Sequence, residues 1–222
     1  MVISAPSEDA DFTLVMGVNS DRYDPASHHV VSNASCTTNA LAPMAWVLDA
    51  SFGLVKGFAL TVHAYTSSQA LVDAPTRKRR RSRAAALNLV PTSTGAAAAV
   101  GRVMPSLAGR LDGLAVRAPN ADGSIVDLTA ELAKDATVEQ VNAAFASAAA
   151  GRLKGILKFV SEDGLVSSDI VGDPHSAVFD APLTMASGHL VKVLAWYDNE
   201  YGYACRMLDA AMLLCGNAGT RS

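Results

Sequence analysis

The sequence predicts a mixed α and β fold in which an antiparallel or mixed sheet is backed by helices. Short apolar or alternating segments follow one another along the chain, as consecutive strands do. Between them lie segments whose apolar residues recur at the spacing of amphipathic helices. Half of the 222 residues are hydrophobic, which is enough for a sizeable core in one large domain or two small ones.

The chain opens with three predicted strands. The first covers residues 1–4 and ends at Pro6, which cannot donate to a strand ladder. Apolar stretches at 12–18 and 29–32 predict the next two, and the polar stretch 19–27 predicts the loop between them.

A helix, a strand and a long irregular stretch follow. Apolar residues recur at helical spacing from about Cys36 to Ser51, and Pro43 predicts a kink inside this helix. Residues 54–66 then alternate as a strand. The stretch 67–90 carries a basic run at its centre, and loops of this length are usually functional or lie at an interface.

The remaining chain alternates between helices and strands in the same way. An Ala-rich helix is predicted from Thr94 to about Pro105, and a capping box at 137–140 opens another that ends near Ala150. A final helix spans about Asn199 to Cys215. The predicted strands of this half are 113–117, 124–132 and 190–197.

Charge is distributed unevenly. Residues 77–83 hold six of the 18 basic residues, so 12 remain against 21 acidic residues, a net charge of −9 outside this run. A chain that is acidic elsewhere is a poor general nucleic-acid binder, and no aromatic residues alternate with these charges to stack on bases. We therefore do not expect a nucleic-acid partner. A non-catalytic protein that binds nucleic acid or acidic partners through 77–83 is the alternative of a different class.

The composition also excludes membrane-spanning, disulfide-rich and zinc-binding classes of protein. No run approaches the roughly 18 consecutive apolar residues of a transmembrane helix, so no membrane partner is expected. Three cysteines spaced far apart fit neither a disulfide framework nor a zinc cluster, so no metal site is predicted. We expect a soluble protein of a reducing compartment, the cytoplasm.

Cys36 is the first candidate for chemistry, because it follows a strand and small polar residues at the predicted start of a helix. Free amide N–H groups and a partial positive charge at such a terminus lower a thiol pKa and could hold a developing oxyanion. A buried, inert cysteine is the commoner situation for a lone cysteine, and Cys205 and Cys215 in the apolar last helix fit it.

His63, towards the end of a predicted strand, is the candidate partner of Cys36. A neighbouring imidazole can pair with a thiolate and serve as base and acid. Spacing along the chain does not show such a contact, and a strand histidine bonded to a backbone carbonyl is an equally good interpretation.

Two further features suggest anion binding. Residues 92–95 supply hydroxyls and flexible backbone at a helix start, although ordinary N-capping also explains them. Arg117 is a single charge in an apolar strand. It must reach solvent or an anion, or pair with an internal carboxylate such as Asp127.

These residues lie in blocks that resemble phosphorylating glyceraldehyde-3-phosphate dehydrogenase. Residues Ser32–Asn39 are similar to that family's active-site signature. The resemblance continues in family order and with near-family spacing through Thr61–Ala64, Ser93–Ala97, Asp127–Thr129 and Trp196–Tyr203.

The resemblance implies an α+β fold with a mixed, largely antiparallel sheet, helices on one face and remnants of a Rossmann domain. Residues 1–35 would be terminal strands of a truncated NAD-binding domain, residues 36–198 the catalytic domain, and residues 199–222 a C-terminal helix that packs on the NAD-binding domain. No glycine-rich dinucleotide-binding turn is found. We therefore expect the N-terminal dinucleotide-binding region to be missing and this chain alone to be inactive as a dehydrogenase.

The resemblance also implies the reaction. Cys36 would attack the aldehyde of glyceraldehyde 3-phosphate, and His63 would activate the thiol and assist hydride departure. Inorganic phosphate would then release 1,3-bisphosphoglycerate from the thioester. NAD is the implied cofactor, favoured by Pro75, with NADP left open, and a homotetramer is the family rule. Erythrose-4-phosphate dehydrogenase, which shares the Cys/His chemistry on a substrate one carbon longer, is the close alternative.

The remaining roles follow the family motif position by position. The residues implied around the attacking phosphate are Ser35, Thr37, Arg81, Thr94 and Gly95. Those implied to hold the substrate's own phosphate are Thr66 and Arg117. Those implied to contact the cofactor are Ser4, Asn199 and Tyr203.

Overall fold

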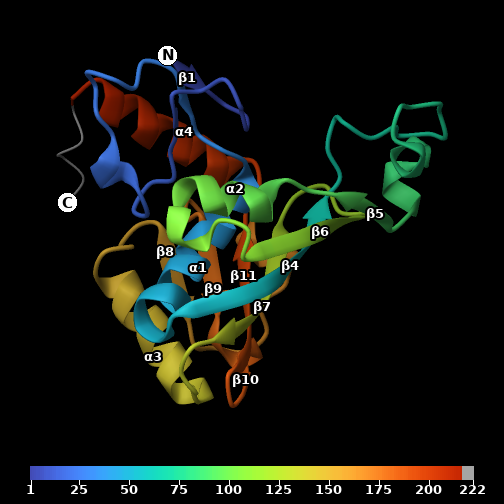
Figure 1. Cartoon of the computed structure of the whole chain (residues 1–222). Helices are drawn as coiled ribbons and strands as arrows, with labels where there is room; N and C mark the ends of the chain where they lie inside the picture. Colours follow the sequence, from blue (N-terminus) through green and yellow to red (C-terminus); the bar gives the residue numbers. More distant parts are fainter. Residues whose placement is uncertain (217–222) are drawn as a thin grey trace.

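The computed structural model describes residues 1–216, which form two sheets, four α-helices and several short 3₁₀ turns (Figure 1). Residues 217–222, the end of the predicted segment 199–222, lie outside the described residues. The division of the chain at residues 36 and 199 stays a prediction.

The smaller sheet is formed by three short strands of the N-terminal segment. Its strands β1 (Val2–Ile3), β3 (Val31–Ser32) and β2 (Phe12–Thr13) are parallel and lie in the order β1-β3-β2. Helix α4 (Tyr201–Leu214) packs against this sheet (Figure 1). Ala210 of the helix is buried there with side chains of the N-terminal segment.

The strand predicted at 12–18 is wrong beyond Thr13. The side chain of Asn19 folds the chain back at this point: its Oδ1 accepts from Val15 N at 2.8 Å, and its Nδ2 donates to the Thr13 carbonyl at 2.8 Å. Leu14 and Val15 are fully buried all the same. The apolar run therefore indicated burial and not an extended backbone.

The larger sheet has eight strands in the order β5-β6-β4-β7-β11-β9-β8, with β10 paired to β11. The pairs β4–β6 and β8–β9 are parallel and the others are antiparallel, which confirms the mixed, largely antiparallel sheet. The strands are β4 (Leu54–Ala64), β5 (Val90–Ser93), β6 (Leu111–Ala118), β7 (Ser124–Leu132), β8 (Leu157–Val160), β9 (Ala177–Asp180), β10 (Met185–Ser187) and β11 (Leu190–Tyr197).

Strands β5, β8, β9 and β10 were not predicted. Each is only three or four residues long, too short for a period of two to stand out. Strand β5 also contains Pro91, which is tolerated because β5 lies at the edge of the sheet.

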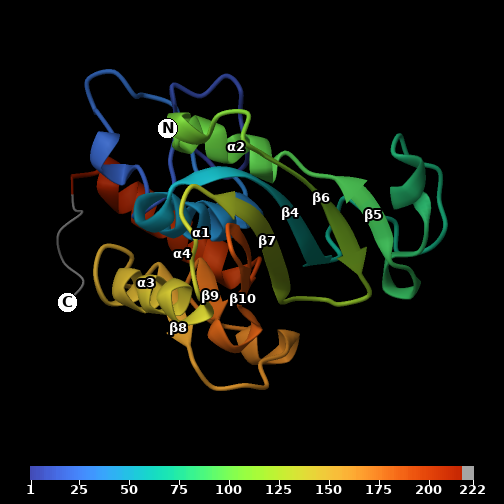
Figure 2. The ribbon, with the colours of Figure 1, turned by 60° about the horizontal axis from the view of Figure 1, so that its bottom comes forward.

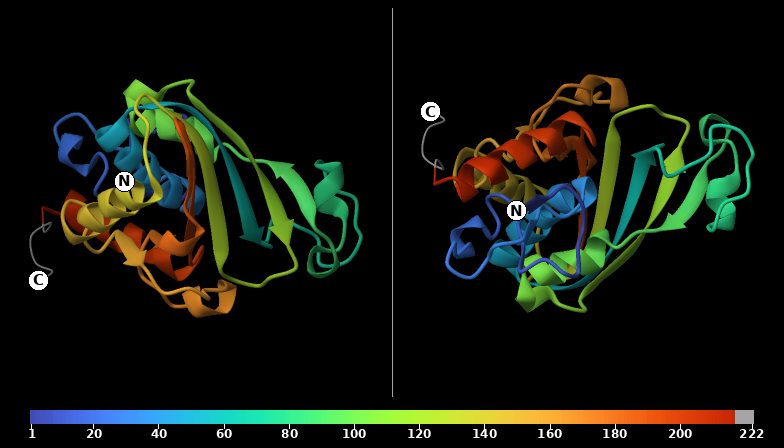
Figure 3. Two further views of the ribbon diagram at one scale, coloured as in Figure 1. Left: turned by 90° about the horizontal axis from the view of Figure 1, so that it is seen from below. Right: turned by 90° about the horizontal axis from the view of Figure 1, so that it is seen from above.

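Helices cover one face of the large sheet, as predicted. Helix α1 (Cys36–Phe52) packs against α2 (Ala96–Val103), α3 (Val138–Ala150) and the central strands (Figure 3). In β7 every second side chain from Ser124 to Leu132 is buried on that side, and the intervening ones are only partly buried. The opposite face carries exposed side chains of β4, β6 and β11.

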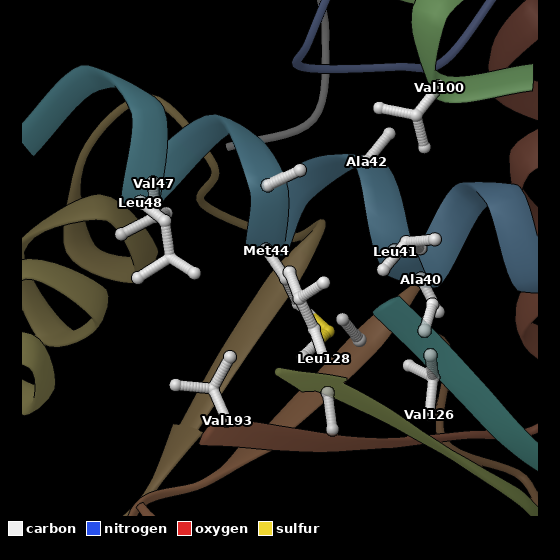
Figure 4. Close-up of a cluster of buried hydrophobic side chains, with 14 of the residues drawn as sticks. Ala40, Leu41, Ala42, Met44, Val47, Leu48, Val100, Val126, Leu128 and Val193 are labelled. Atoms are coloured by element: carbon white, nitrogen blue, oxygen red, sulfur yellow. The ribbon is translucent and has the colours of Figure 1, made fainter. Parts of the chain in front are cut away.

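The core lies between α1 and the sheet. Leu41, Met44 and Leu48 of the helix and Leu128 and Val193 of the strands below are fully buried (Figure 4). Burying a side chain of this kind stabilises the fold by about 1.5–3 kcal/mol. The helix continues through Pro43 without a break, and it packs on β4 as well as on β7 and β11.

The segment between β4 and β5 is irregular, as predicted, and extends away from the rest of the chain (Figures 1 and 2). Two 3₁₀ turns, Arg79–Ser82 and Ala85–Leu87, interrupt it. Backbone bonds from Ala70 to Arg81 and from Ala74 to Ser82 fold it back on itself. Among the described residues, no helix is both long and apolar enough to cross a membrane.

Candidate active site

Cys36 is the first residue of α1, as predicted. Ser35 caps this helix, since its hydroxyl accepts from the backbone N–H of Thr38 at 3.0 Å. Ala34 has a φ of 55°, in the left-handed region that residues other than glycine rarely adopt. The chain therefore turns sharply out of β3 and places the thiol at the helix start.

Strand β4 brings His63 to this thiol. The Cys36 Sγ atom lies 3.4 Å from His63 Nε2, and His63 is only 4% exposed. His63 Nδ1 lies 2.7 Å from the carbonyl oxygen of Ala64. The sequence analysis offered two interpretations of His63, a partner of Cys36 or a histidine bonded to a backbone carbonyl. The structure shows both contacts.

Tyr197 connects the elements that carry this pair, a role that the sequence analysis missed. Its hydroxyl lies 2.8 Å from the hydroxyls of both Thr37 in α1 and Thr61 in β4. Its ring lies edge-on to the imidazole of His63, with the two ring centroids 5.9 Å apart. A buried tyrosine requires a partner for its hydroxyl. The resemblance block Trp196–Tyr203 marked this region, but nothing local showed which partner Tyr197 takes.

The parallel pairing of β4 with β6 sets Arg117 directly opposite His63. Arg117 Nη1 lies 2.6 Å from His63 Nδ1 and donates to the Ala64 carbonyl at 2.9 Å. Asp127, considered as a structural partner for Arg117, instead pairs with Lys192. The buried Nε of Arg117 has no hydrogen-bond partner among the described residues, so an anion could bind there.

A pocket of about 610 Å³ opens beside these residues. The predicted site residues that line it are Ser35, Thr37, His63, Arg81, Thr94, Gly95 and Arg117. Its wall also contains Lys78, Arg102 and Glu8. Arg102 is paired with Glu8 at 2.8 Å, so the pocket carries an excess of positive charge.

Arg81 and Lys78 reach this pocket from the basic segment. Arg81 Nε donates to Thr92 Oγ1 at 3.0 Å, and Lys78 Nζ donates to Ser93 Oγ at 3.3 Å. The sequence analysis assigned Lys78 no role. Its position in the basic run was the feature that could have indicated its place in the pocket wall. With Arg83 paired to Asp73, half of the six basic residues of the run have polar partners.

Thr66 is not in the pocket wall but is connected to it. Its hydroxyl lies 2.9 Å from that of Ser68, which in turn accepts from Arg81 Nη1 at 3.2 Å. Through Ser68, the structure therefore connects Thr66, implied to hold the substrate's own phosphate, with Arg81, implied to hold the attacking phosphate.

The three residues implied for the cofactor also lie outside the pocket wall. Ser4 is exposed just after β1. Asn199 is buried, and its Oδ1 accepts from Ser124 Oγ at 2.6 Å. Tyr203 donates its hydroxyl to the Ala34 carbonyl at 2.9 Å and so reaches the loop before Cys36.

The electrostatics of the Cys36–His63 pair differ from the sequence-based expectation. Burial raises the pKa of the Cys36 thiol, and hydrogen bonds with Thr37 and the charge of Arg117 oppose this only in part. Burial, and then the charge of Arg117, lower the pKa of His63 to about 4. The predicted lowering of the thiol pKa is therefore wrong, because the effect of burial on this pKa is larger than the opposite effect of the helix terminus. Both partners are neutral near pH 7.

Comparison with known families agrees with this geometry. Residues 35–199 match the family described as "Glyceraldehyde 3-phosphate dehydrogenase, C-terminal domain". The chain belongs to the glyceraldehyde-3-phosphate dehydrogenase family.

Two relatives with this name illustrate the similarity. The chain is 58% identical over 214 residues to the glyceraldehyde-3-phosphate dehydrogenase of Mycobacterium avium, an alignment that covers 96% of this chain and 62% of the relative. It is 57% identical over 216 residues to that of Streptomyces coelicolor, covering 96% of this chain and 64% of the relative. The chain thus spans less than two thirds of the length of these relatives.

Proposed function

We propose that this chain carries the catalytic region of a phosphorylating glyceraldehyde-3-phosphate dehydrogenase. The proposed reaction oxidises glyceraldehyde 3-phosphate with NAD and inorganic phosphate to 1,3-bisphosphoglycerate. The observation that carries the proposal is the contact of Cys36 with His63 beside a pocket that holds Arg81 and Arg117. The names of the relatives support it over the part of their length that the chain spans.

Cys36 supplies the nucleophile. As its sulfur bonds to the aldehyde carbon, the thiol proton passes to His63 Nε2, which lies 3.4 Å from the sulfur. An imidazole with a pKa of about 4 is neutral near pH 7, so a ring nitrogen is free to accept that proton. The amide N–H groups at the start of α1 stabilise the oxygen as it gains negative charge.

The residues proposed for the cofactor fit the nicotinamide end of NAD. The Ser124 hydroxyl holds Oδ1 of Asn199, while Nδ2 has a long 3.4 Å contact to Glu200 and remains able to donate to a carboxamide. Tyr203 lies next to the turn before Cys36, because its hydroxyl donates to the Ala34 carbonyl. Bound there, NAD would supply the oxidation as the hydride acceptor. His63 returns the thiol proton to the negatively charged oxygen of the adduct to form its hydroxyl, and takes the same proton back as the hydride leaves the carbon.

The phosphate groups are assigned to the positive pocket. Arg117 is proposed to hold the phosphate of the substrate, while Arg81, Thr94 and Gly95 hold inorganic phosphate. A phosphate oxygen attacks the thioester carbonyl carbon, and the Cys36 sulfur leaves as the thiolate. Burial lowers the pKa of Arg117, and the charge of Arg81 lowers it further, because the two arginines repel each other across the pocket. Bound phosphate relieves that repulsion.

We also propose a homotetramer that works in the cytoplasm. The outer face of the large sheet is the one turned away from the helices (Figure 3). Within the described residues, this face exposes apolar side chains, among them Phe58 at 74% and Leu190 at 53%. Exposed apolar faces of this kind commonly pair with other subunits. The three cysteines are free, which suits a reducing compartment.

The test is turnover by this chain after a dinucleotide-binding region has been joined to it. We expect NADH formation that requires inorganic phosphate, prefers glyceraldehyde 3-phosphate to erythrose 4-phosphate, and falls by about a thousandfold or more in Cys36→Ser. Faster turnover of erythrose 4-phosphate would favour the alternative enzyme. Turnover that is independent of phosphate or unchanged in Cys36→Ser would refute the proposal.

A further inference from the structure

Lys78 reaches the positive pocket because the local backbone directs it there. It lies directly before the 3₁₀ turn Arg79–Ser82, and the backbone N–H of Arg81 donates to its carbonyl at 2.8 Å. Side chains three residues apart in such a turn lie on the same side, so Lys78 and Arg81 both reach β5. Lys78 Nζ donates to Ser93 Oγ at 3.3 Å. Arg81 Nε donates to Thr92 Oγ1 at 3.0 Å, one residue earlier in the strand.

The contact with Ser93 places the ammonium group of Lys78 at one end of the pocket. Ser93 lines the pocket and directly precedes Thr94 and Gly95, which are proposed to hold inorganic phosphate. In the pairing of β5 with β6, Arg117 lies three positions along β6 from the residue opposite Ser93, a distance of about 10 Å. Lys78 is therefore nearer to the proposed position of inorganic phosphate than to the Arg117 end.

The pocket wall offers this lysine no carboxylate partner among the described residues. Glu8 is the carboxylate in the wall, and it is paired with Arg102 at 2.8 Å. Between Gly95 and Arg102, helix α2 contributes only alanines to the wall. The ammonium group has three N–H donors, and the Ser93 hydroxyl accepts one of them. Two donors and a positive charge therefore remain for an anionic ligand.

We propose that Lys78 is a further ligand of the attacking inorganic phosphate, beside Arg81, Thr94 and Gly95. Its free N–H groups donate to phosphate oxygens, and its charge balances part of the charge of the dianion. The role of this phosphate in the reaction rests on the proposed function, whereas its binding can be measured without turnover.

A ligand of inorganic phosphate acts on the last step of the proposed reaction. Phosphate attacks the thioester, so the loss of a phosphate ligand weakens phosphate binding and slows that attack. The bond between Cys36 and the aldehyde carbon forms before this phosphate reacts. Lys78 therefore affects the KM for inorganic phosphate and leaves the KM for the aldehyde substrate unchanged.

Phosphate binding by the 222-residue chain tests the assignment. We would label the chain with ¹⁵N and titrate it with sodium phosphate at pH 7, following the backbone amide signals of Thr94 and Gly95. Sodium chloride at matched ionic strength is the control for salt. We expect Lys78→Gln to raise the dissociation constant of phosphate by about fivefold, because an exposed ion pair is lost. Lys78 is exposed, so its replacement leaves the core intact.

Arg80→Gln is the matched control. It removes one positive charge from the same turn, but Arg80 is exposed and lies outside the pocket wall. Its dissociation constant should stay within about twofold of the wild type, because salt screens charges that do not contact the ligand.

Equal dissociation constants for Lys78→Gln and the wild type would overturn the inference. An equal rise in Arg80→Gln would also overturn it, because the effect would then be one of general charge. A wild-type chain that does not bind phosphate would overturn both this inference and the assignment of the pocket to phosphate. If Lys78→Gln weakens phosphate binding but the chain joined to a dinucleotide-binding region does not oxidise the aldehyde, the inference holds and the proposed function fails.

Discussion

The Tyr197 hydroxyl offers a sharp test of how Cys36 and His63 are held together. It is fully buried and bonds both Thr37, next to Cys36, and Thr61, two residues before His63. Tyr197→Phe removes this hydroxyl and leaves the ring in place. We expect the substitution to destabilise the fold and to loosen the contact between Cys36 and His63.

The magnitude follows from the partners that remain. Each of the two lost hydrogen bonds contributes about 0.5–1.5 kcal/mol. Thr61 keeps a bond from its hydroxyl to the Ile125 carbonyl at 3.0 Å, but the buried hydroxyl of Thr37 loses the bond that the structure shows for it. The expected loss is about 2 kcal/mol of unfolding free energy. With a urea m-value of about 2 kcal/mol/M, this lowers the unfolding midpoint by about 1 M.

Urea unfolding monitored by circular dichroism measures this loss. Tyr201→Phe is the matched control, because that ring is 52% exposed and its variant should unfold within about 0.5 kcal/mol of the wild type. A double-mutant cycle of Tyr197→Phe with Thr37→Val should give a coupling energy near 1 kcal/mol. A Tyr197→Phe chain as stable as the Tyr201→Phe control would refute the reasoning.

Three further outcomes are expected. His63 has its pKa lowered from 6.5 to about 4 in the folded chain, so the unfolded chain binds a proton more readily and stability falls as the pH drops from 6.5 towards 4. The loss attributable to His63 is about 2 kcal/mol by pH 5, and urea unfolding of His63→Gln should not show it. Gly113→Ala should cost more than about 2 kcal/mol because the new Cβ would clash with the Ala59 carbonyl in the paired strand. Gly95→Ala, with no atom within 4 Å of its Cβ, should cost less than about 1 kcal/mol, and equal costs would argue against this register. In the chain joined to a dinucleotide-binding region, Arg117→Ala should lower kcat/KM for the proposed substrate, glyceraldehyde 3-phosphate, by about tenfold or more, roughly 1.4 kcal/mol, and affect unphosphorylated glyceraldehyde far less. Equal losses on both aldehydes would assign Arg117 a purely structural role.

Features encoded within a few neighbouring residues could be predicted from the sequence. The capping box of Thr137 and Gln140 is present at the start of α3, and α1 begins at Cys36. The strand predicted at 124–132 is present as β7, and the structure shows that every second side chain of it is buried. The strands of three or four residues escaped prediction because the sheet provides their hydrogen bonds, and their sequences carry too few residues to show a pattern.

The sequence by itself determined which groups were available to the site, and only the tertiary structure decided what they do to one another. Cys36 and His63 lie 27 positions apart, and it is the packing of α1 on β4 that puts their side chains in contact. Likewise, the register of β4 on β6 sets Arg117 beside His63. The thiol pKa is raised because surrounding elements remove water from Cys36, and the local helix signal contains no information on that burial. Short-range bonding is specified by neighbours in the chain, whereas solvation and charge depend on every element that closes around the site.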